Sequence, residues 1–310
     1  MSANHSECRR EEEEKPSSAP VSPSEEATLS EGEVIRHLGS GEITPRMWDV
    51  LAGRVTPVRP RDAATVLLVR QADRGLEVYL LRRVASMRFA PGMYAFPGGS
   101  VDPRDSDHTI RWSGPPPREW ARAFGADEAL ARALVCAAVR ETFEESGVLL
   151  AGPSENEVVA DTRGDDWEED RQALLNRSLS LAELLDRRGL VLRSDLLCPW
   201  ARWITPAMEP RRYDTRFFVA VLPEGQQPRD VGGEADHVTW MSPEEAVRQW
   251  RAGQLAMLPP TVANLKSLIG YATPEEVLAA EREIVPVQPE FRKSAGGITL
   301  IVPDGVDYPF

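Results

Sequence analysis

The sequence predicts an α+β protein in which strands and helices alternate along the chain. An apolar run at residues 63–70 is typical of a buried strand, and a turn at 73–75 joins it to an antiparallel partner at 77–83. An Ala- and Leu-rich helix is expected at 127–147. Two further strands are expected after that helix, at 200–205 and 213–222.

Helix-capping residues indicate where the later helices begin. A capping box of Ser180 and Glu183 lies within a helical stretch at 170–188, and Ser242 with Pro243 begins another helix. Further elements are expected after these: a helix from the proline pair at 259–260 to about residue 269, a capped helix at 273–284 and a strand at 297–302.

The composition narrows the class of protein. The 310 residues suffice for one large domain or two small ones, and 42% hydrophobic residues can build a substantial core. The formal net charge of −13 argues against a protein that coats nucleic acid, so an anionic ligand must be met by a local arginine cluster or a metal ion. Three cysteines without a metal-binding spacing indicate a reducing, cytoplasmic location.

The chain contains no recognisable membrane or export segment. No stretch of about 18 apolar residues is present, so no membrane span is expected, and the N-terminal region lacks the apolar core of a secretory signal. Residues 1–40 are rich in Ser, Pro and Glu, which predicts a disordered acidic tail.

The helix at 127–147 carries the residues that point to chemistry. Asp127 fits its N-cap, and its mostly apolar circumference predicts burial. Glu141, Glu144 and Glu145 nevertheless share one arc of this helix. Buried like charges are costly unless a hard divalent cation such as Mg²⁺ or Mn²⁺ joins them. The alternative is that Glu144 and Glu145 face solvent at a frayed helix end.

Arginines and glycines elsewhere supply further candidates. Arg83 and Arg88 can offer positive charge to phosphates, or they are ordinary exposed loop arginines. The Gly98-Gly99 pair permits a close backbone approach to a metal, with the Gly99 carbonyl as a ligand, or it is simply a turn.

The expected strand at 213–222 adds two more arginines. Arg212 and Arg216 are candidate contacts for a phosphate or a base. Asp214 and Arg216 alternate with Thr215 and Phe217, so the two charged side chains are expected on one face of the sheet.

The end of the long helix resembles the signature of a known enzyme family. Arg140-Glu141-x-x-Glu144-Glu145-x-Gly147-Val148 matches the second half of the Nudix box, G-x5-E-x7-R-E-U-x-E-E-x-G-U, in which U is apolar. Phe96-Pro97-Gly98-Gly99 resembles its first half. Gly99 and Arg140 lie 41 positions apart instead of about 14, so about 27 residues, assigned to 100–126, are inserted within the box.

Two positions depart from the box. Arg132 stands eight positions before Arg140, where the box has its first Glu. Either Asp127 or Glu128 takes that role, or no residue does. Thr142 stands where an apolar residue is usual. The inserted segment is expected to lie beside the site as an ordered lid that restricts the substrates that fit. The alternative is a passive surface excursion.

A second motif resembles the coenzyme A diphosphatase branch of the family. Arg83-x4-Arg88-x3-Gly92-x3-Phe96-Pro97-Gly98-Gly99 follows the spacing of its signature, L-L-T-x-R-S-x3-R-x3-G-x3-F-P-G-G. Leu81 and Val84 stand where that signature has Thr and Ser. The resemblance implies the Nudix fold, an α-β-α sandwich whose mixed central sheet is flanked by helices. It assigns 41–270 to the Nudix hydrolase domain and leaves 271–310 as a C-terminal helix and extended tail.

The resemblance also implies roles for the site residues. Glu141, Glu144, Glu145 and the Gly99 carbonyl would hold Mg²⁺ or Mn²⁺, and Arg140 would orient a carboxylate. The general base would be one of these glutamates or Glu234, because the family often brings a further Glu from this part of the chain. The expected substrate contacts are Arg83, Arg88, Phe96, Arg212 and Arg216.

The implied reaction is metal-dependent hydrolysis of a phosphoanhydride in a nucleoside diphosphate linked to another moiety. The spacing from Arg83 to Gly99 favours coenzyme A or acyl-CoA as the substrate. Because Leu81 and Val84 depart from that signature, the alternative substrates are ADP-ribose, a nucleotide sugar or a dinucleoside polyphosphate. Because Arg132 stands at an acidic position of the box, the alternative function is that of a catalytically inactive ligand-binding regulator. The expected partner is a small nucleotide-type molecule, without nucleic acid or membrane, and a homodimer is a further possibility.

Overall fold

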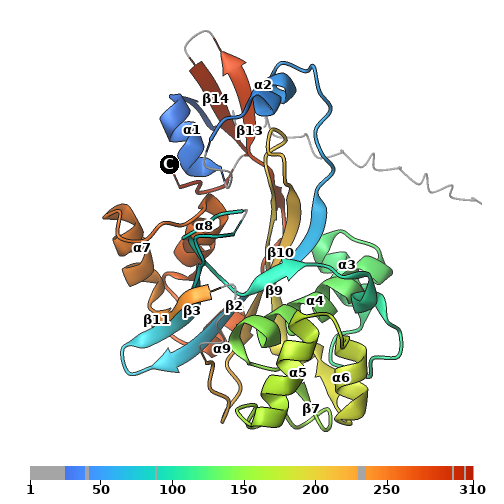
Figure 1. Cartoon of the computed structure of the whole chain (residues 1–310). Helices are drawn as coiled ribbons and strands as arrows, with labels where there is room; N and C mark the ends of the chain where they lie inside the picture. Colours follow the sequence, from blue (N-terminus) through green and yellow to red (C-terminus); the bar gives the residue numbers. More distant parts are fainter. Residues whose placement is uncertain are drawn as a thin grey trace, which may run out of the picture.

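A mixed central sheet forms the middle layer of the protein (Figure 1). The computed structural model describes residues 25–38, 42–87, 89–229, 235–294, 297–303 and 305–309. The strand order is β11-β3-β2-β10-β9-β12, with β4 paired to β3 and β5 paired to β2. These strands are β2 (Arg61–Ala72), β3 (Gly75–Arg83), β4 (Tyr94–Ala95), β5 (Gly98–Ser100), β9 (Leu197–Ile204), β10 (Tyr213–Val221), β11 (Ala235–Met241) and β12 (Pro286–Val287). β10 runs parallel to β2, and β3 runs antiparallel to β2. β9 runs antiparallel to β10 and parallel to β12.

The strand β2 divides the interior into two cores. Leu67 and Val69 belong to one cluster of buried side chains, and Val66 and Leu68 belong to the other. Successive side chains of a strand point to opposite faces, so a continuous apolar run is what a strand buried on both faces requires. The expected strands at 63–70 and 77–83 are therefore confirmed as β2 and β3.

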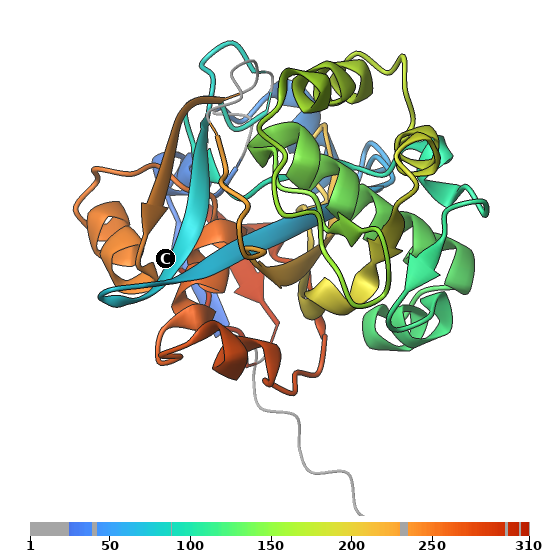
Figure 2. The same ribbon diagram turned by 90° about the horizontal axis from the view of Figure 1, so that it is seen from below.

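Helices cover both faces of this sheet, which gives the expected α-β-α sandwich (Figure 2). On one face lie α3 (Pro117–Phe124) and α4 (Glu128–Ser146), and on the other lie α7 (Pro243–Arg251) and α8 (Pro259–Leu268). The view from below places the green α4 on one side of the blue strands and the orange-to-red helices on the other.

The bounds of α4 follow from its two caps. The Asp127 side chain accepts a hydrogen bond of 2.8 Å from the Leu130 backbone N–H. Gly147 has φ of 74°, the left-handed conformation that ends a helix and that glycine adopts without strain. Both caps were expected from the sequence, and both are confirmed.

Some expected elements differ in extent. The expected helix at 273–284 is wrong beyond Leu278, because α9 spans only Pro274–Leu278. The stretch 170–188 contains two helices, α5 (Asp165–Leu175) and α6 (Leu181–Arg187), the second with the predicted capping box. A small second sheet contains β6 (Trp112–Ser113), β7 (Ala151–Gly152) and β8 (Val191–Arg193).

The expectation of a disordered tail over 1–40 is wrong for residues 25–38. They form β1 (Glu25–Leu29) and α1 (Glu31–His37), and β1 pairs antiparallel with β14 (Gly297–Val302). β14 also pairs with β13 (Glu290–Ser294), and α2 (Pro45–Leu51) packs nearby. Leu29 and Val34 enter the same core as α8, so the segments at the two ends of the described chain belong to the main body.

The segment between Ser100 and α4 is ordered. It contains a short 3-10 helix, η1 (Pro103–Ser106), then β6 and α3. Trp120 and Phe124 of α3 stack with ring centroids 6.2 Å apart, and both contact Phe218 of β10. The aromatic residues of this segment therefore pack into the core beside α4.

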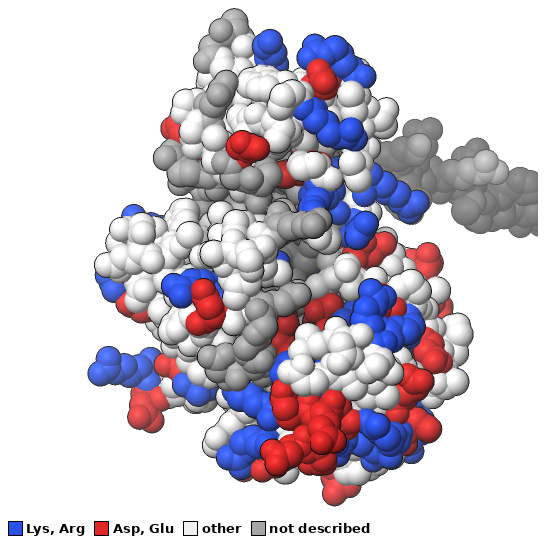
Figure 3. Space-filling model, viewed as in Figure 1, with Lys and Arg blue, Asp and Glu red and all other residues white. Residues whose placement is uncertain are grey.

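Charge is distributed unevenly over the surface. In Figure 3 acidic and basic side chains gather over the region of α5 and α6, while the face around α8 is largely uncharged. Arg188 of the linker after α6 pairs with Asp166 and Asp170, which links the two helices through ion pairs. In the described part of the chain, no helix combines the length and the apolar character needed to cross a membrane.

Candidate active site

The last turns of α4 meet the Gly98-Gly99 pair of β5. The Gly98 backbone N–H donates a hydrogen bond of 2.7 Å to Glu145 Oε2. A Cβ atom on Gly99 would collide with the carboxylate of Glu141, so a larger residue here would push that carboxylate out of its present position. The two sequence segments that resemble the halves of one motif are thus in direct contact in space.

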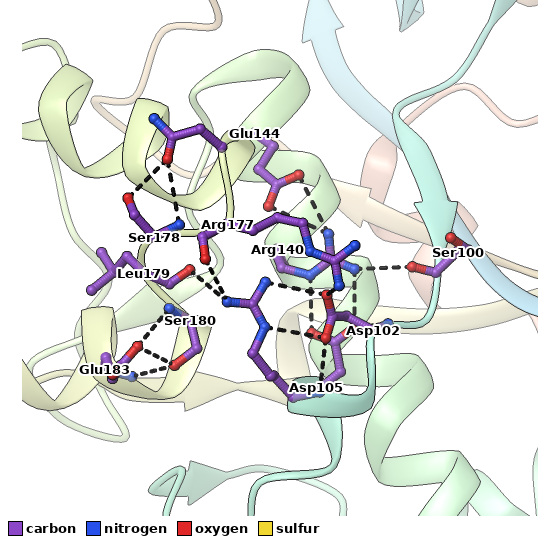
Figure 4. A network of polar contacts seen from close by, with 12 residues as sticks. Ser100, Asp102, Asp105, Arg140, Glu144, Arg177, Ser178, Leu179, Ser180 and Glu183 are labelled. Atoms are coloured by element: carbon purple, nitrogen blue, oxygen red, sulfur yellow. Dashed lines mark hydrogen bonds and ion pairs between the residues drawn. The ribbon is translucent and has the colours of Figure 1, made fainter.

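Arg140 holds the acidic residues in place. Its Nη1 donates to Glu141 Oε1 at 2.7 Å and lies 3.3 Å from both carboxylate oxygens of Glu144. Its Nη2 also donates to the Ser100 carbonyl at 3.1 Å, which ties the helix to β5. Figure 4 shows this guanidinium between Ser100, Asp105 and Glu144.

Asp105 completes the arginine's contacts, and sequence reasoning missed it. Arg140 Nε and Nη2 each donate to one oxygen of Asp105 at 2.9 Å, a bidentate pair in which Asp105 is only 1% exposed. Asp105 stands six positions after Gly99, the spacing at which the box has its first acidic residue. The insertion therefore begins after Asp105, and counting forward from Gly99 would have found it.

The residues considered for that position have other roles. Arg132 donates to the carbonyls of Asp107 at 3.0 Å and Ile110 at 2.9 Å, so it holds the inserted segment against α4. Asp127 caps α4, and Glu128 is exposed in its first turn. The expectation that Asp127 or Glu128 replaces the first acid is wrong.

A second layer of ion pairs supports the loop that carries Asp105. Asp102 caps η1 by accepting from the Arg104 backbone N–H at 2.9 Å, and its carboxylate also pairs with the side chains of Arg104 and Arg177 (Figure 4). Arg104 in turn donates to the carbonyl of Arg177 at 3.1 Å. These contacts join η1 to the linker between α5 and α6.

Burial shapes the electrostatics of the acidic cluster. Removal from water, together with the charge of Glu144, raises the pKa of Glu141 to about 7, although Arg140 opposes this rise. Burial alone would lower the pKa of Arg140, but the hydrogen bond with Asp105 and the nearby carboxylates raise it instead. Glu144 is 8% exposed and Glu145 is 9% exposed, so the alternative of a solvent-facing frayed helix end is wrong.

The donor types of this cluster fit a hard divalent cation. Asp105, Glu141 and Glu144 bring three carboxylates to Arg140, and Glu145 adds a fourth beside Gly98. Carboxylate oxygens are the ligands that Mg²⁺ and Mn²⁺ prefer. Among the described residues, no three acidic, His or Cys side chains are grouped as a ready metal site. The carboxylates instead bond to Arg140 and to the Gly98 N–H, so the metal ligands remain a prediction.

A cavity of about 480 Å³ opens at this cluster. Glu141, Glu144 and Glu145 line it together with Gly98 and Gly99. The rest of its lining is largely aromatic and aliphatic, and includes Phe89, Trp203, Phe217, Leu258 and Tyr308. Polar side chains of His37, Thr205, Glu209 and Thr261 also line it. The cavity therefore joins the acidic cluster to a largely apolar lining.

Two of the expected substrate contacts line this cavity. Arg83 lies at the end of β3, where its Nε donates to the Phe89 carbonyl at 3.3 Å, and Phe96 contributes from the segment between β4 and β5. Arg88 and Glu234, the candidate base, lie outside the described residues.

The expectation for Arg212 and Arg216 is wrong, because neither lines this cavity. Arg216 is 2% exposed and binds Asp62 Oδ1 at 2.6 Å, while Arg212 donates to the carbonyls of Thr205 and Val58. β10 turns its other face to the cavity, with Tyr213, Thr215 and Phe217. Period-two alternation divides a strand into two faces but does not reveal which one borders a site.

Comparison with known proteins identifies the family. A family model described as the NUDT19 Nudix domain matches residues 121–268. A putative nudix hydrolase 7 of Caenorhabditis elegans is 29% identical over 208 residues, which cover 67% of this chain and 60% of that protein. The acyl-coenzyme A diphosphatase NUDT19 of Xenopus laevis is 26% identical over 239 residues, with 65% of this chain and 62% of that protein covered. The chain thus spans about three fifths of the length of these two relatives.

A solved structure extends the likeness to the fold. The crystal structure of a NUDIX hydrolase from Alicyclobacillus acidocaldarius is 31% identical and superposes with a TM-score of 0.64. The match covers 73% of this chain and 98% of that one. With the two halves of the box in contact around Arg140, these similarities establish that the chain belongs to the Nudix hydrolase family.

Proposed function

We propose that this protein is a metal-dependent diphosphatase that hydrolyses the phosphoanhydride of acyl-CoA or coenzyme A. The observation that carries the proposal is the cavity that joins the acidic cluster to an apolar compartment. A substrate that fits both ends needs a charged diphosphate and a less polar arm, and acyl-CoA has both. The relatives named acyl-coenzyme A diphosphatase support the same choice.

The acidic cluster provides the expected metal ligands. Glu141, Glu144, Glu145 and the Gly99 carbonyl would hold Mg²⁺ or Mn²⁺. Such an ion, when bound, supplies charge neutralisation at the diphosphate and a nucleophile from its bound water. The residues of the chain do the remaining work through positioning, which accounts for much of the catalysis in phosphoryl-transfer enzymes.

Four residues of the chain do this positioning. Arg140 draws Glu141 and Glu144 together, and Asp105 fixes the plane of the Arg140 guanidinium through two hydrogen bonds of 2.9 Å. The Gly98 N–H orients Glu145 through a hydrogen bond of 2.7 Å. Arg83, at the rim of the same cavity, offers a cation to the diphosphate.

The other hypotheses are less well supported. Leu81 is buried in the core of β3, so its departure from the coenzyme A signature reflects packing. Val84, the other departure, is only half-buried, so ADP-ribose, a nucleotide sugar or a dinucleoside polyphosphate stays the alternative substrate. The inactive regulator was suggested by Arg132 at an acidic position, and Asp105 now occupies that place in the sequence spacing. A cytoplasmic location and a homodimer stay predictions.

A substrate panel tests the proposal. The full-length protein with Mg²⁺ or Mn²⁺ should release adenosine bisphosphate and a phosphopantetheine product from acyl-CoA or coenzyme A, as measured by mass spectrometry. Glu144→Gln and Glu145→Gln should abolish this release, while Glu128→Gln, an exposed residue of the same helix, should retain it. Cleavage of ADP-ribose without any cleavage of coenzyme A or acyl-CoA would reject this substrate class. Full turnover by both glutamine variants would reject the assigned site.

A further inference from the structure

The apolar end of the cavity is closed by a part of the chain outside the matched family segment. We define the small-sheet module as β1, α1, β13 and β14 with Tyr308 beyond them, and it stands at one end of the molecule above α8 (Figure 1). The family model matches residues 121–268, so this module lies outside the match. His37 and Tyr308 nevertheless line the same cavity as Glu145.

The wall that the module contributes is aromatic. The Tyr308 ring lies 5.5 Å from the His37 ring and 6.0 Å from the Trp203 ring, measured between centroids. Tyr308 is 4% exposed and Trp203 is 6% exposed, so both rings are fixed by packing. Three separate elements thus meet at this wall: α1, β9 and the segment after β14.

A second cavity continues behind this wall. It also has a volume of about 480 Å³, and Leu29, Trp250 and Met257 contribute apolar surface to it. The charged residues Glu33, Arg251 and Lys266 line it as well. Three residues, His37, Pro259 and Tyr308, line both cavities. These residues therefore form the partition between a compartment that begins at the acidic cluster and a further space under the module.

Other side chains of the module serve its stability. Leu300 and Val302 of β14 are fully buried in the core, and neither lines the first cavity. Tyr308 belongs to the same buried cluster and, unlike these two residues, also lines the cavity.

We propose that the acyl chain of the substrate lies in the apolar compartment and that Tyr308 and His37 set the length of chain accepted. This inference rests on the proposed function. Each methylene group buried before the partition should raise kcat/KM about fourfold. Once the chain reaches the partition, a further methylene group should leave kcat/KM unchanged or lower it. The chain-length preference would then be set by a module outside the matched family segment.

The test is a series of saturated acyl-CoA substrates from acetyl to palmitoyl. Wild-type kcat/KM should rise with chain length and then level off or fall. Tyr308→Ala removes the partition, so the optimum should move to longer chains. Leu258→Trp adds a ring at a half-buried position of the compartment wall, so the optimum should move to shorter chains.

Arg292→Ala is the matched control, because Arg292 is an exposed residue of β13 in the same module. It should leave the whole series unchanged, and thermal unfolding checks that each variant folds. If Tyr308→Ala fails to fold, the shift in Leu258→Trp still decides the question. A wild-type rate that is independent of chain length, or equal losses on every substrate in both cavity variants, would overturn the inference while coenzyme A cleavage persists. Failure of the proposed function looks different, because no coenzyme A substrate would then be cleaved.

Discussion

Asp105 fixes the arginine around which the acidic cluster is arranged. Its carboxylate accepts two hydrogen bonds of 2.9 Å from Arg140 and is 1% exposed. Residues that hold a metal ligand in orientation typically change affinity or activity by about 10–100-fold when altered. Asp105→Asn should therefore lower kcat by about 10–100-fold with a small effect on KM, because the bidentate pair is lost.

Steady-state kinetics with Mg²⁺ measures this, and Asp105→Glu should restore part of kcat because it keeps the carboxylate. Thermal unfolding of both variants separates positioning from stability. An unchanged kcat in Asp105→Asn would show that Arg140 needs no such support.

Cys136 gives a pH dependence whose sign follows from burial. Burial in α4 raises the pKa of its thiol from 9.0 to about 12. The folded state therefore holds the thiol proton more tightly than the unfolded state, so this contribution to stability is complete below pH 9 and is lost as pH rises toward 12. At pH 10.5 the loss is about 2 kcal/mol.

Urea unfolding at pH 8 and pH 10.5 measures the effect, with Cys136→Ala as the reference. The wild type should lose about 2 kcal/mol more than the variant between the two pH values. Equal losses in both proteins would mean that the thiol is accessible to water in the folded state.

At the scale of single residues, the sequence located the cluster but not its support. Glu141, Glu144 and Glu145 could be placed on one buried arc because the helix period and the motif agree. Asp105 escaped detection because counting back from Arg140 crosses the insertion, whereas counting forward from Gly99 does not. Arg216 was misplaced because alternation alone does not say which face of β10 borders the cavity.

At the scale of elements, the inserted segment that contains α3 could act as a lid over the site or as part of the packed core. Trp120 is 3% exposed, packs on Phe218 at 5.5 Å between ring centroids and donates from its indole N–H to the Pro115 carbonyl at 3.1 Å. These contacts anchor the inserted segment in the core beside α4. Trp120→Ala should therefore destabilise the protein by about 3–5 kcal/mol.

The ratio of kcat/KM values for acetyl-CoA and palmitoyl-CoA should stay unchanged in Trp120→Ala at a temperature where it is folded. Urea unfolding and paired kinetics measure the two quantities. A changed substrate ratio without a loss of stability would instead support a lid.

Local sequence signals were sufficient to predict β2, β3 and α4, because the hydrophobic periods, turns and caps that define them all lie within or next to these elements.

At the scale of the whole molecule, the sequence predicted β14 but missed the pairing that builds the small-sheet module. The segment 25–38 looks polar and charged in isolation, and its partner strand lies near the other end of the described chain. Propensity and composition describe neighbours in sequence, so a pairing of this range leaves no local sign. Leu38, which follows α1, is 1% exposed in the main core.

Leu38→Ala should destabilise the protein by about 2–5 kcal/mol, because it leaves a void where the module meets the body. Chemical denaturation measures this, and Gly32→Ala in the preceding helix α1 is a mild control because nothing lies within 4 Å of its added Cβ. If both variants unfold at the wild-type midpoint, the module contributes little to the common core.

The pairing of β1 with β14 also bears on how the protein reaches its native state. Residues about 270 positions apart must find one another, and loop closure over such a span carries a large entropic cost and slows the search. β2 and β3 are joined by a short turn, so they can pair without closing a long loop, whereas β1 and β14 cannot. We therefore expect refolding kinetics in which the sandwich forms early and the end wall of the cavity docks last, so that binding competence lags behind the recovery of secondary structure.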